Sequence, residues 1–80
     1  MPSNTLIQLK HLLLSLLPNE PIESTTSLFA SGMLDSIALI EVVELIEKHW
    51  SIRFGWTDVT LDNLDSLEKM SSFIERKLEG

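Results

Sequence analysis

Apolar residues recur at the spacing of an α-helix in several separate stretches of the chain. Pro18 stops the leucine-rich first stretch, and the polar segment after it sustains neither a helical nor a strand period. The pattern therefore predicts an all-α fold of four helices in one domain, three of them longer and one short. The predicted elements are a helix over about 4–17, a loop over 18–35, a helix over 36–49, a short helix over about 58–62 and a helix over about 66–78.

The long loop between the first two helices is unusual for so small a domain, because such connections tend to be functional or pinned to the core. Ile22, Leu28 and Phe29 are the apolar side chains that could pin it. A passive crossover between the helices explains the same residues equally well. Both interpretations stay open at this point.

The short third helix depends on tertiary contacts, because so few residues do not form a stable helix alone. Thr57 or Asp58 can cap its start, and Val59 and Leu61 are its expected anchors in the core. The pattern therefore predicts that it begins near residue 58.

The start of the last helix is marked by polar residues at capping positions. We expect it to open at Asp65 or Ser66, because Glu68 stands at capping-box spacing from Asp65. Asp58, Asp62 and Asp65 form an acidic cluster, but they lack the alternating oxygen ligands, central glycine and closing glutamate of a calcium loop. Helix capping accounts for these carboxylates, and we predict no metal site.

The start of the second helix combines a turn, a capping carboxylate and a hydroxyl. Gly32 permits a tight turn, Asp35 can accept free N–H groups of the first helical turn, and Ser36 then occupies the first helical position. The helix dipole and unpaired N–H groups favour an anion there, so a phosphate ester on Ser36 would be well placed. Asp-Ser is also an ordinary helix start, and the dipeptide alone does not decide between the two interpretations.

The outer face of the second helix mixes acidic and large apolar side chains. Glu41, Glu44 and Glu47 follow at intervals of three residues, and Ile37 and Ile40 fall on the same side. Isoleucines inside an acidic stripe are typical of a docking surface, although scattered exposed apolar residues are also normal. The serine at the edge of this face favours a site for a protein partner.

The composition restricts the partners and the compartment. A net charge of −6 repels nucleic acids and anionic membranes, and it is complementary to a basic protein surface. The apolar run 12–17 is too short to span a membrane, and the chain has no cysteine for disulfides, thiolate metal sites or thiol chemistry of its own. We expect a cytoplasmic protein, monomeric in solution.

Catalytic residues are not evident in the sequence. His11 and His49 lie on different predicted helices, with no serine or carboxylate partner indicated by spacing. A chain of this size also has little bulk to enclose a substrate pocket. We therefore expect a protein that is not an enzyme.

The segment LFASGMLDSI over residues 28–37, continued by the apolar residues of the second helix, resembles the Asp-Ser-Leu motif of acyl carrier proteins. Residues 52–54 and 63–68 fit the same family, so the resemblance covers nearly the whole chain. It implies a four-helix bundle whose motif serine, here Ser36, carries 4′-phosphopantetheine. A phosphopantetheinyl transferase attaches this group from coenzyme A.

The resemblance also implies how partners are recognised. Asp35 and the second helix would form the recognition site, with apolar contacts from its isoleucines and steering of basic enzymes by its glutamates. The residues concerned are Ile37, Ile40, Glu41, Glu44 and Glu47. The expected partners are the transferase, a ligase that loads an acyl or aminoacyl group as a thioester, and a downstream transferase or synthase.

The resemblance is closer to some carriers than to others. Ile37, Ala38 and Glu44 depart from the residues usual in carriers of fatty-acid synthesis. The pattern looks more similar to D-alanyl carriers and to stand-alone aminoacyl or peptidyl carriers. The alternative from another functional class is an unmodified acidic adaptor that binds basic proteins through the same helix.

Overall fold

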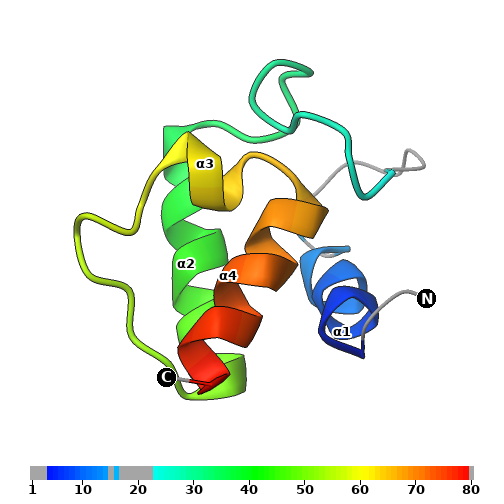
Figure 1. The fold of residues 1–80 in the computed structure, drawn as a ribbon. Coiled ribbons are helices and arrows are strands. Elements are labelled where there is room, and N and C mark those ends of the chain that lie inside the picture. The colour runs from blue at the N-terminus through cyan, green and yellow to red at the C-terminus, as the bar shows by residue number, and fades with distance from the viewer. Residues whose placement is uncertain (1–3, 15, 17–22, 80) are drawn as a thin grey trace.

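The computed structural model describes residues 4–14, 16 and 23–79, and within this part of the chain every regular element is a helix (Figure 1). The helices are α1 Asn4–Leu13, α2 Ser36–Trp50, α3 Leu61–Leu64 and α4 Leu67–Glu79. The all-α prediction and the expected short third helix are confirmed. The fold is a helical bundle of the acyl-carrier type.

The helices enclose one core, to which the loop before α2 also contributes. Helix α1 packs against α4 and α2, and α3 packs against α4. Side chains spaced three and four residues apart place one face of each longer helix inward. The core consists of Leu9, Leu13, Leu28, Leu34, Val42, Ile46, Leu64, Leu67, Met70 and Ile74.

The predicted end of helix α1 near residue 17 is wrong, because the helix ends at Leu13. The chain continues as a turn in which the Leu16 N–H donates to the Leu13 carbonyl at 3.0 Å, and Leu16 packs against the core. Leu14 is 66% exposed and does not widen the buried face. Because a turn also brings a side chain back to the core after three residues, the leucine spacing overstated the helix length.

Helix α3 begins three residues later than predicted, and its expected anchors are wrong. Asp58 belongs to a turn with Gly55, while Val59 and Leu61 are exposed. The buried residue of the helix is Leu64, which is 1% exposed. The burial of this leucine determines where so short a helix forms, and a capping side chain does not.

Helix α4 begins at Leu67, as expected for a cap at Ser66. The Ser66 hydroxyl accepts the Lys69 N–H at 3.1 Å, which satisfies one free donor of the first turn. Asp65, the alternative cap, directs its carboxylate to the loop before α2 and not to the first turn of α4.

Ser51, which follows α2, has a left-handed backbone with φ 56°. This conformation strains a residue with a Cβ atom but not glycine. We expect Ser51→Gly to raise the free energy of unfolding by about 0.5–1 kcal/mol. Urea denaturation would measure the change, and Ser72→Gly on the exposed side of α4 is the matched control, expected to lower stability. Equal destabilisation by both variants would contradict the prediction.

Candidate functional site

The loop before α2 is attached to the start of α4 by its backbone. The Leu28 N–H donates to the Asp65 carbonyl at 2.7 Å, and the Glu68 N–H donates to the Ser24 carbonyl at 2.9 Å. Leu28 is fully buried and Phe29 packs against the core, as predicted. Ile22, the third expected pin, lies outside the described residues. The described part of the loop is therefore pinned to the core.

The Asp65 carboxylate fixes the same loop. It accepts the Ser27 hydroxyl, with distances of 2.8 and 3.0 Å to its two oxygens, and the Phe29 N–H at 3.2 Å. The Ser27 hydroxyl in turn accepts the Ala30 N–H at 3.2 Å. We call this set of bonds, made by Ser27, Phe29, Ala30 and Asp65, the Asp65 latch. The sequence did not reveal it, because spacing indicated a helix cap at this residue.

Gly32 redirects the chain from the latch toward α2. Its φ of 80° is left-handed, and its N–H donates to the Phe29 carbonyl at 3.1 Å, as the predicted tight turn requires. Leu34 is then buried, and its N–H donates to the Leu28 carbonyl at 3.0 Å. The residues just before α2 are thus held on both sides of the turn.

Helix α2 begins at Ser36, with Asp35 as its cap. The Asp35 carboxylate accepts the Ala38 N–H at 2.8 Å, and its carbonyl accepts the Leu39 N–H at 2.9 Å. The N–H groups of Ser36 and Ile37 have no acceptor inside the helix, since they are the first two of its N-terminal turn. Ser36 is exposed. An anion on its hydroxyl would meet two free donors and the positive end of the helix dipole.

The outer face of α2 combines the predicted apolar and acidic side chains. Ile37 is 73% exposed and Ile40 is 60% exposed, and Glu41 and Glu44 are also exposed. Glu47 differs, because it is half-buried and its carboxylate accepts the Phe54 N–H at 2.8 Å. Glu47 therefore orients the chain after α2, a contact that its spacing did not indicate.

Comparison with known families identifies the chain. Residues 6–74 match the family described as Phosphopantetheine attachment site. The chain belongs to this family. The comparison with curated proteins found no match. The phosphopantetheine attachment family carries a covalently attached 4′-phosphopantetheine, and its members are generally carriers without catalytic activity that interact with a phosphopantetheinyl transferase and biosynthetic enzymes.

The residues around α2 fit this prosthetic group. An exposed hydroxyl at a helix start, with free N–H donors beside it, suits a phosphodiester.

Within the described residues, no helix has the length and apolar content needed to cross a bilayer. No group of three or more acidic, histidine or cysteine side chains in this part of the chain could hold a metal ion.

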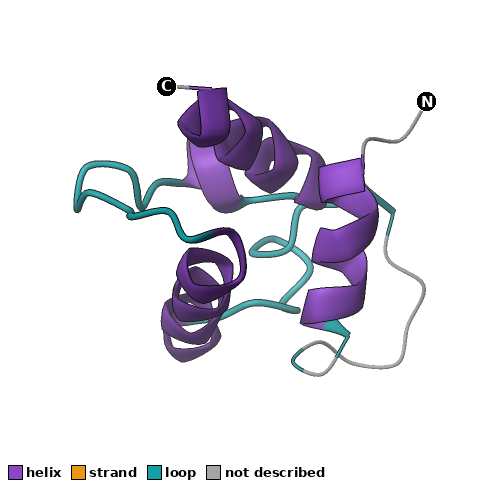
Figure 2. Cartoon of the chain, turned by 90° about the horizontal axis from the view of Figure 1, so that it is seen from below, coloured by secondary structure: helices purple, strands orange, loops and turns teal. Residues whose placement is uncertain are grey.

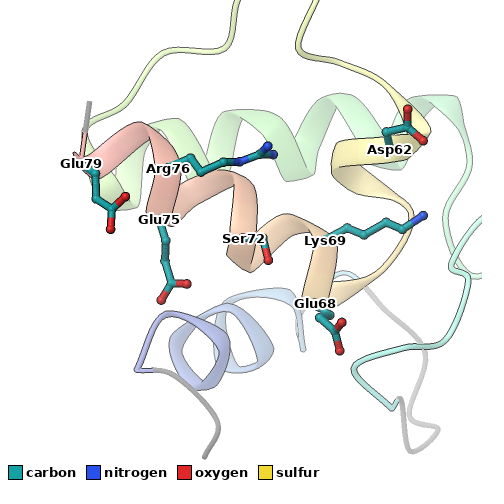
Figure 3. A pocket seen from close by; sticks show the side chains of 7 residues that line it. All are labelled: Asp62, Glu68, Lys69, Ser72, Glu75, Arg76 and Glu79. Atoms are coloured by element: carbon teal, nitrogen blue, oxygen red, sulfur yellow. The ribbon is translucent and has the colours of Figure 1, made fainter.

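Two surface depressions of the carrier lie away from Ser36. One runs along the outer side of α4, where Glu75 and Glu79 point to one side and the Arg76 guanidinium to another (Figure 3). The other lies between α1 and α2, which brings His11 and His49 together, and the His49 Nε2 lies 3.0 Å from the Gln8 Oε1.

Proposed function

We propose that Ser36 is the attachment site of 4′-phosphopantetheine in this chain. The observation that supports the proposal is the exposed Ser36 hydroxyl at the first position of α2, inside the matched range 6–74. Asp35 accepts the Ala38 N–H and leaves the two preceding N–H groups free for a phosphodiester. The turn at Gly32 and the Asp65 latch hold this position without contacting the hydroxyl.

The chemistry of attachment requires little from the carrier itself. The Ser36 oxygen attacks the phosphorus of coenzyme A that bears the pantetheine arm, its proton passes to a base of the transferase, and the nucleotide half of coenzyme A leaves. The attached group supplies the thiol that the chain lacks and holds its cargo as a thioester. The chain contributes an accessible hydroxyl and a rigid helix end that the transferase can recognise.

The test is the intact mass of the protein before and after incubation with coenzyme A and a broad-specificity phosphopantetheinyl transferase. A gain of one phosphopantetheine, located on Ser36 by fragmentation of the modified peptide, is expected. A folded protein that gains no mass, or gains it on another residue, would contradict the proposal. In the first case an unmodified adaptor becomes the better interpretation.

We further propose that the cargo is an acyl or aminoacyl group shuttled between a loading ligase and a downstream transferase or synthase. The support is the departure of Ile37, Ala38 and Glu44 from the residues usual in fatty-acid carriers, which favours aminoacyl cargo. Incubation of the holo protein with ATP and either a D-alanine-activating ligase with D-alanine or a fatty-acid-activating ligase with a fatty acid would distinguish the two. Loading of the fatty acid alone would contradict the aminoacyl assignment.

We expect exposed acidic residues of α2 to steer basic partner enzymes. Glu41 and Glu44 are exposed and suit a test, whereas Glu47 also holds Phe54 and would confound one. The double variant Glu41→Lys with Glu44→Lys should slow modification by the transferase by about tenfold at low salt, and the difference should shrink as ionic strength rises. Initial rates at several salt concentrations would measure it.

The matched control for this variant reverses two exposed charges on α4. Glu75→Lys with Glu79→Lys changes the net charge equally but lies on another helix. Equal slowing by both double variants would show an effect of net charge alone and would contradict an α2 docking face.

A further inference from the structure

Trp56 is the most exposed large apolar side chain in the described part of the protein, with 91% of its surface in solvent. It lies at the tip of a turn formed by Gly55–Asp58, which we call the Trp56 turn. The Asp58 N–H donates to the Gly55 carbonyl at 2.9 Å, and the Gly55 N–H donates to the Asp58 carboxylate at 2.8 Å. The turn thus presents the indole outward.

The base of the Trp56 turn is fixed to α4 and α3. The Asp58 carboxylate pairs with the Lys77 ammonium at 3.1 Å, and the Asp58 carbonyl accepts the Asn63 side-chain amide at 2.9 Å. The bond from the Gly55 N–H, and then the Lys77 ammonium, lower the pKa of Asp58. Four contacts thus order the turn although its largest apolar side chain takes no part in the fold.

The chain preceding the turn is anchored in the same way. The Phe54 ring stacks on the Phe73 ring of α4 with centroids 4.6 Å apart, and the Phe54 N–H is held by Glu47. The position of Trp56 is therefore set by its neighbours and does not depend on packing of the indole. A rigid aromatic side chain loses little entropy on binding a partner.

Two more apolar side chains extend this surface along the chain. Val59 is 39% exposed and Leu61, the first residue of α3, is 57% exposed. Figures 1 and 2 both place the segment between α2 and α3 on the side of the molecule away from α1. Figure 1 also shows that α3 and the start of α2, where Ser36 lies, are at the same end of the bundle.

The outer face of α2 offers few large apolar contacts to an enzyme that binds this protein. A standard interface covers about 800 Å² per partner, roughly a seventh of the 5285 Å² exposed by the described chain. Only Ile37 and Ile40 supply large exposed apolar side chains on that face. Tryptophan is enriched among the residues that dominate binding energy, so Trp56 is a suitable additional anchor.

The net charge of the chain indicates which kind of partner would bind the surface around Trp56. Two copies of a chain that carries −6 repel one another, and so do this chain and an anionic membrane. A basic enzyme surface is attracted. We propose that Trp56, Val59 and Leu61 form a second docking element for the phosphopantetheinyl transferase, with the Trp56 indole in an apolar cleft of that enzyme. This inference rests on the proposed modification of Ser36.

Transferase kinetics test the proposal, with the carrier as the varied substrate. Trp56→Ala should lower kcat/KM by about five- to tenfold, mainly through a higher KM, because docking contacts are made equally in the ground and transition states. Trp56→Phe should lower kcat/KM less than Trp56→Ala does. Leu14→Ala is the control, since Leu14 is 66% exposed after α1 and should leave both constants unchanged.

The kinetic outcomes separate this proposal from the one on which it rests. If the wild-type protein is not modified at Ser36, both proposals are contradicted. A modified wild type with equal kcat/KM for Trp56→Ala removes the docking element alone. A fall in kcat without a change in KM would also contradict docking.

Fluorine NMR of protein labelled with 5-fluorotryptophan tests the contact directly, with the Trp56 signal assigned by Trp56→Phe. The signal should shift or broaden on addition of the transferase, while the signal of the half-buried Trp50 changes less. It should not respond to phosphatidylcholine vesicles or to the carrier's own concentration. A response to vesicles or to concentration, with none to the transferase, would assign this surface to a membrane or to a second copy and overturn the proposal.

Discussion

Ser36→Ala is expected to abolish the gain of one phosphopantetheine that we predict for the wild-type protein with coenzyme A and a transferase. The reason is chemical, because the methyl group provides no oxygen to form the phosphodiester. Folding should be unaffected, since Ser36 is exposed and the Asp35 cap that holds the start of α2 remains. Intact mass measures the loss, and urea denaturation should give a stability within about 0.5 kcal/mol of the wild type.

The control for this variant removes a different exposed hydroxyl. Ser72→Ala on the outer side of α4 should be modified as fast as the wild type. Full modification of Ser36→Ala would disprove the site. If neither the variant nor the wild type is modified but both bind the same basic partner, the protein would be an adaptor.

Asp65→Ala should lower the free energy of unfolding by about 2–3 kcal/mol, because it removes two charge-assisted bonds and leaves the Phe29 N–H without its acceptor. The loss should concentrate in the loop before α2. Urea denaturation measures the global effect, and hydrogen exchange should show faster exchange of the Phe29 and Ala30 amides. Asp62→Ala, an exposed acid on α3, should change stability by less than about 0.5 kcal/mol.

A second prediction concerns Ser27, which donates its hydroxyl to Asp65 in the Asp65 latch. Ser27→Ala removes one donor to the Asp65 carboxylate and the acceptor of the exposed Ala30 N–H, and it should cost about 1 kcal/mol. If Asp65→Ala and Asp62→Ala were equally mild, the carboxylate would contribute nothing to holding the loop. If Asp65→Ala weakened the whole protein without faster exchange at Phe29, the bonds would stabilise α4 and not the loop.

The features that the sequence predicted depend on residues close together in the chain. The start of α2 at Ser36 and the cap at Asp35 follow from local hydrogen bonding over three residues. The exposed positions of Ile37 and Ile40 follow from helical periodicity. Each of these predictions needed only the geometry of a single helix.

The features that it missed depend on tertiary contacts. Ser27 and Asp65 lie 38 residues apart in the chain, so spacing assigned Asp65 to a local cap. The bond between Glu47 and the Phe54 N–H crosses the end of a helix, where periodicity no longer applies. Helix α3 was misplaced because burial of Leu64, a property of the assembled core, decides its position.

The exposed hydroxyl of Ser36 has a consequence for how partners distinguish the unmodified and the modified carrier. Within the described residues, this hydroxyl makes no hydrogen bond to the rest of the fold, and Asp35 holds the helix end whether or not the serine is esterified. If Ser36 is modified as proposed, we therefore expect the arrangement of helices to stay unchanged. On this proposal, an enzyme that accepts only one of the two states would have to sense the arm and its added negative charge, because the protein surface around Ser36 would be the same in both.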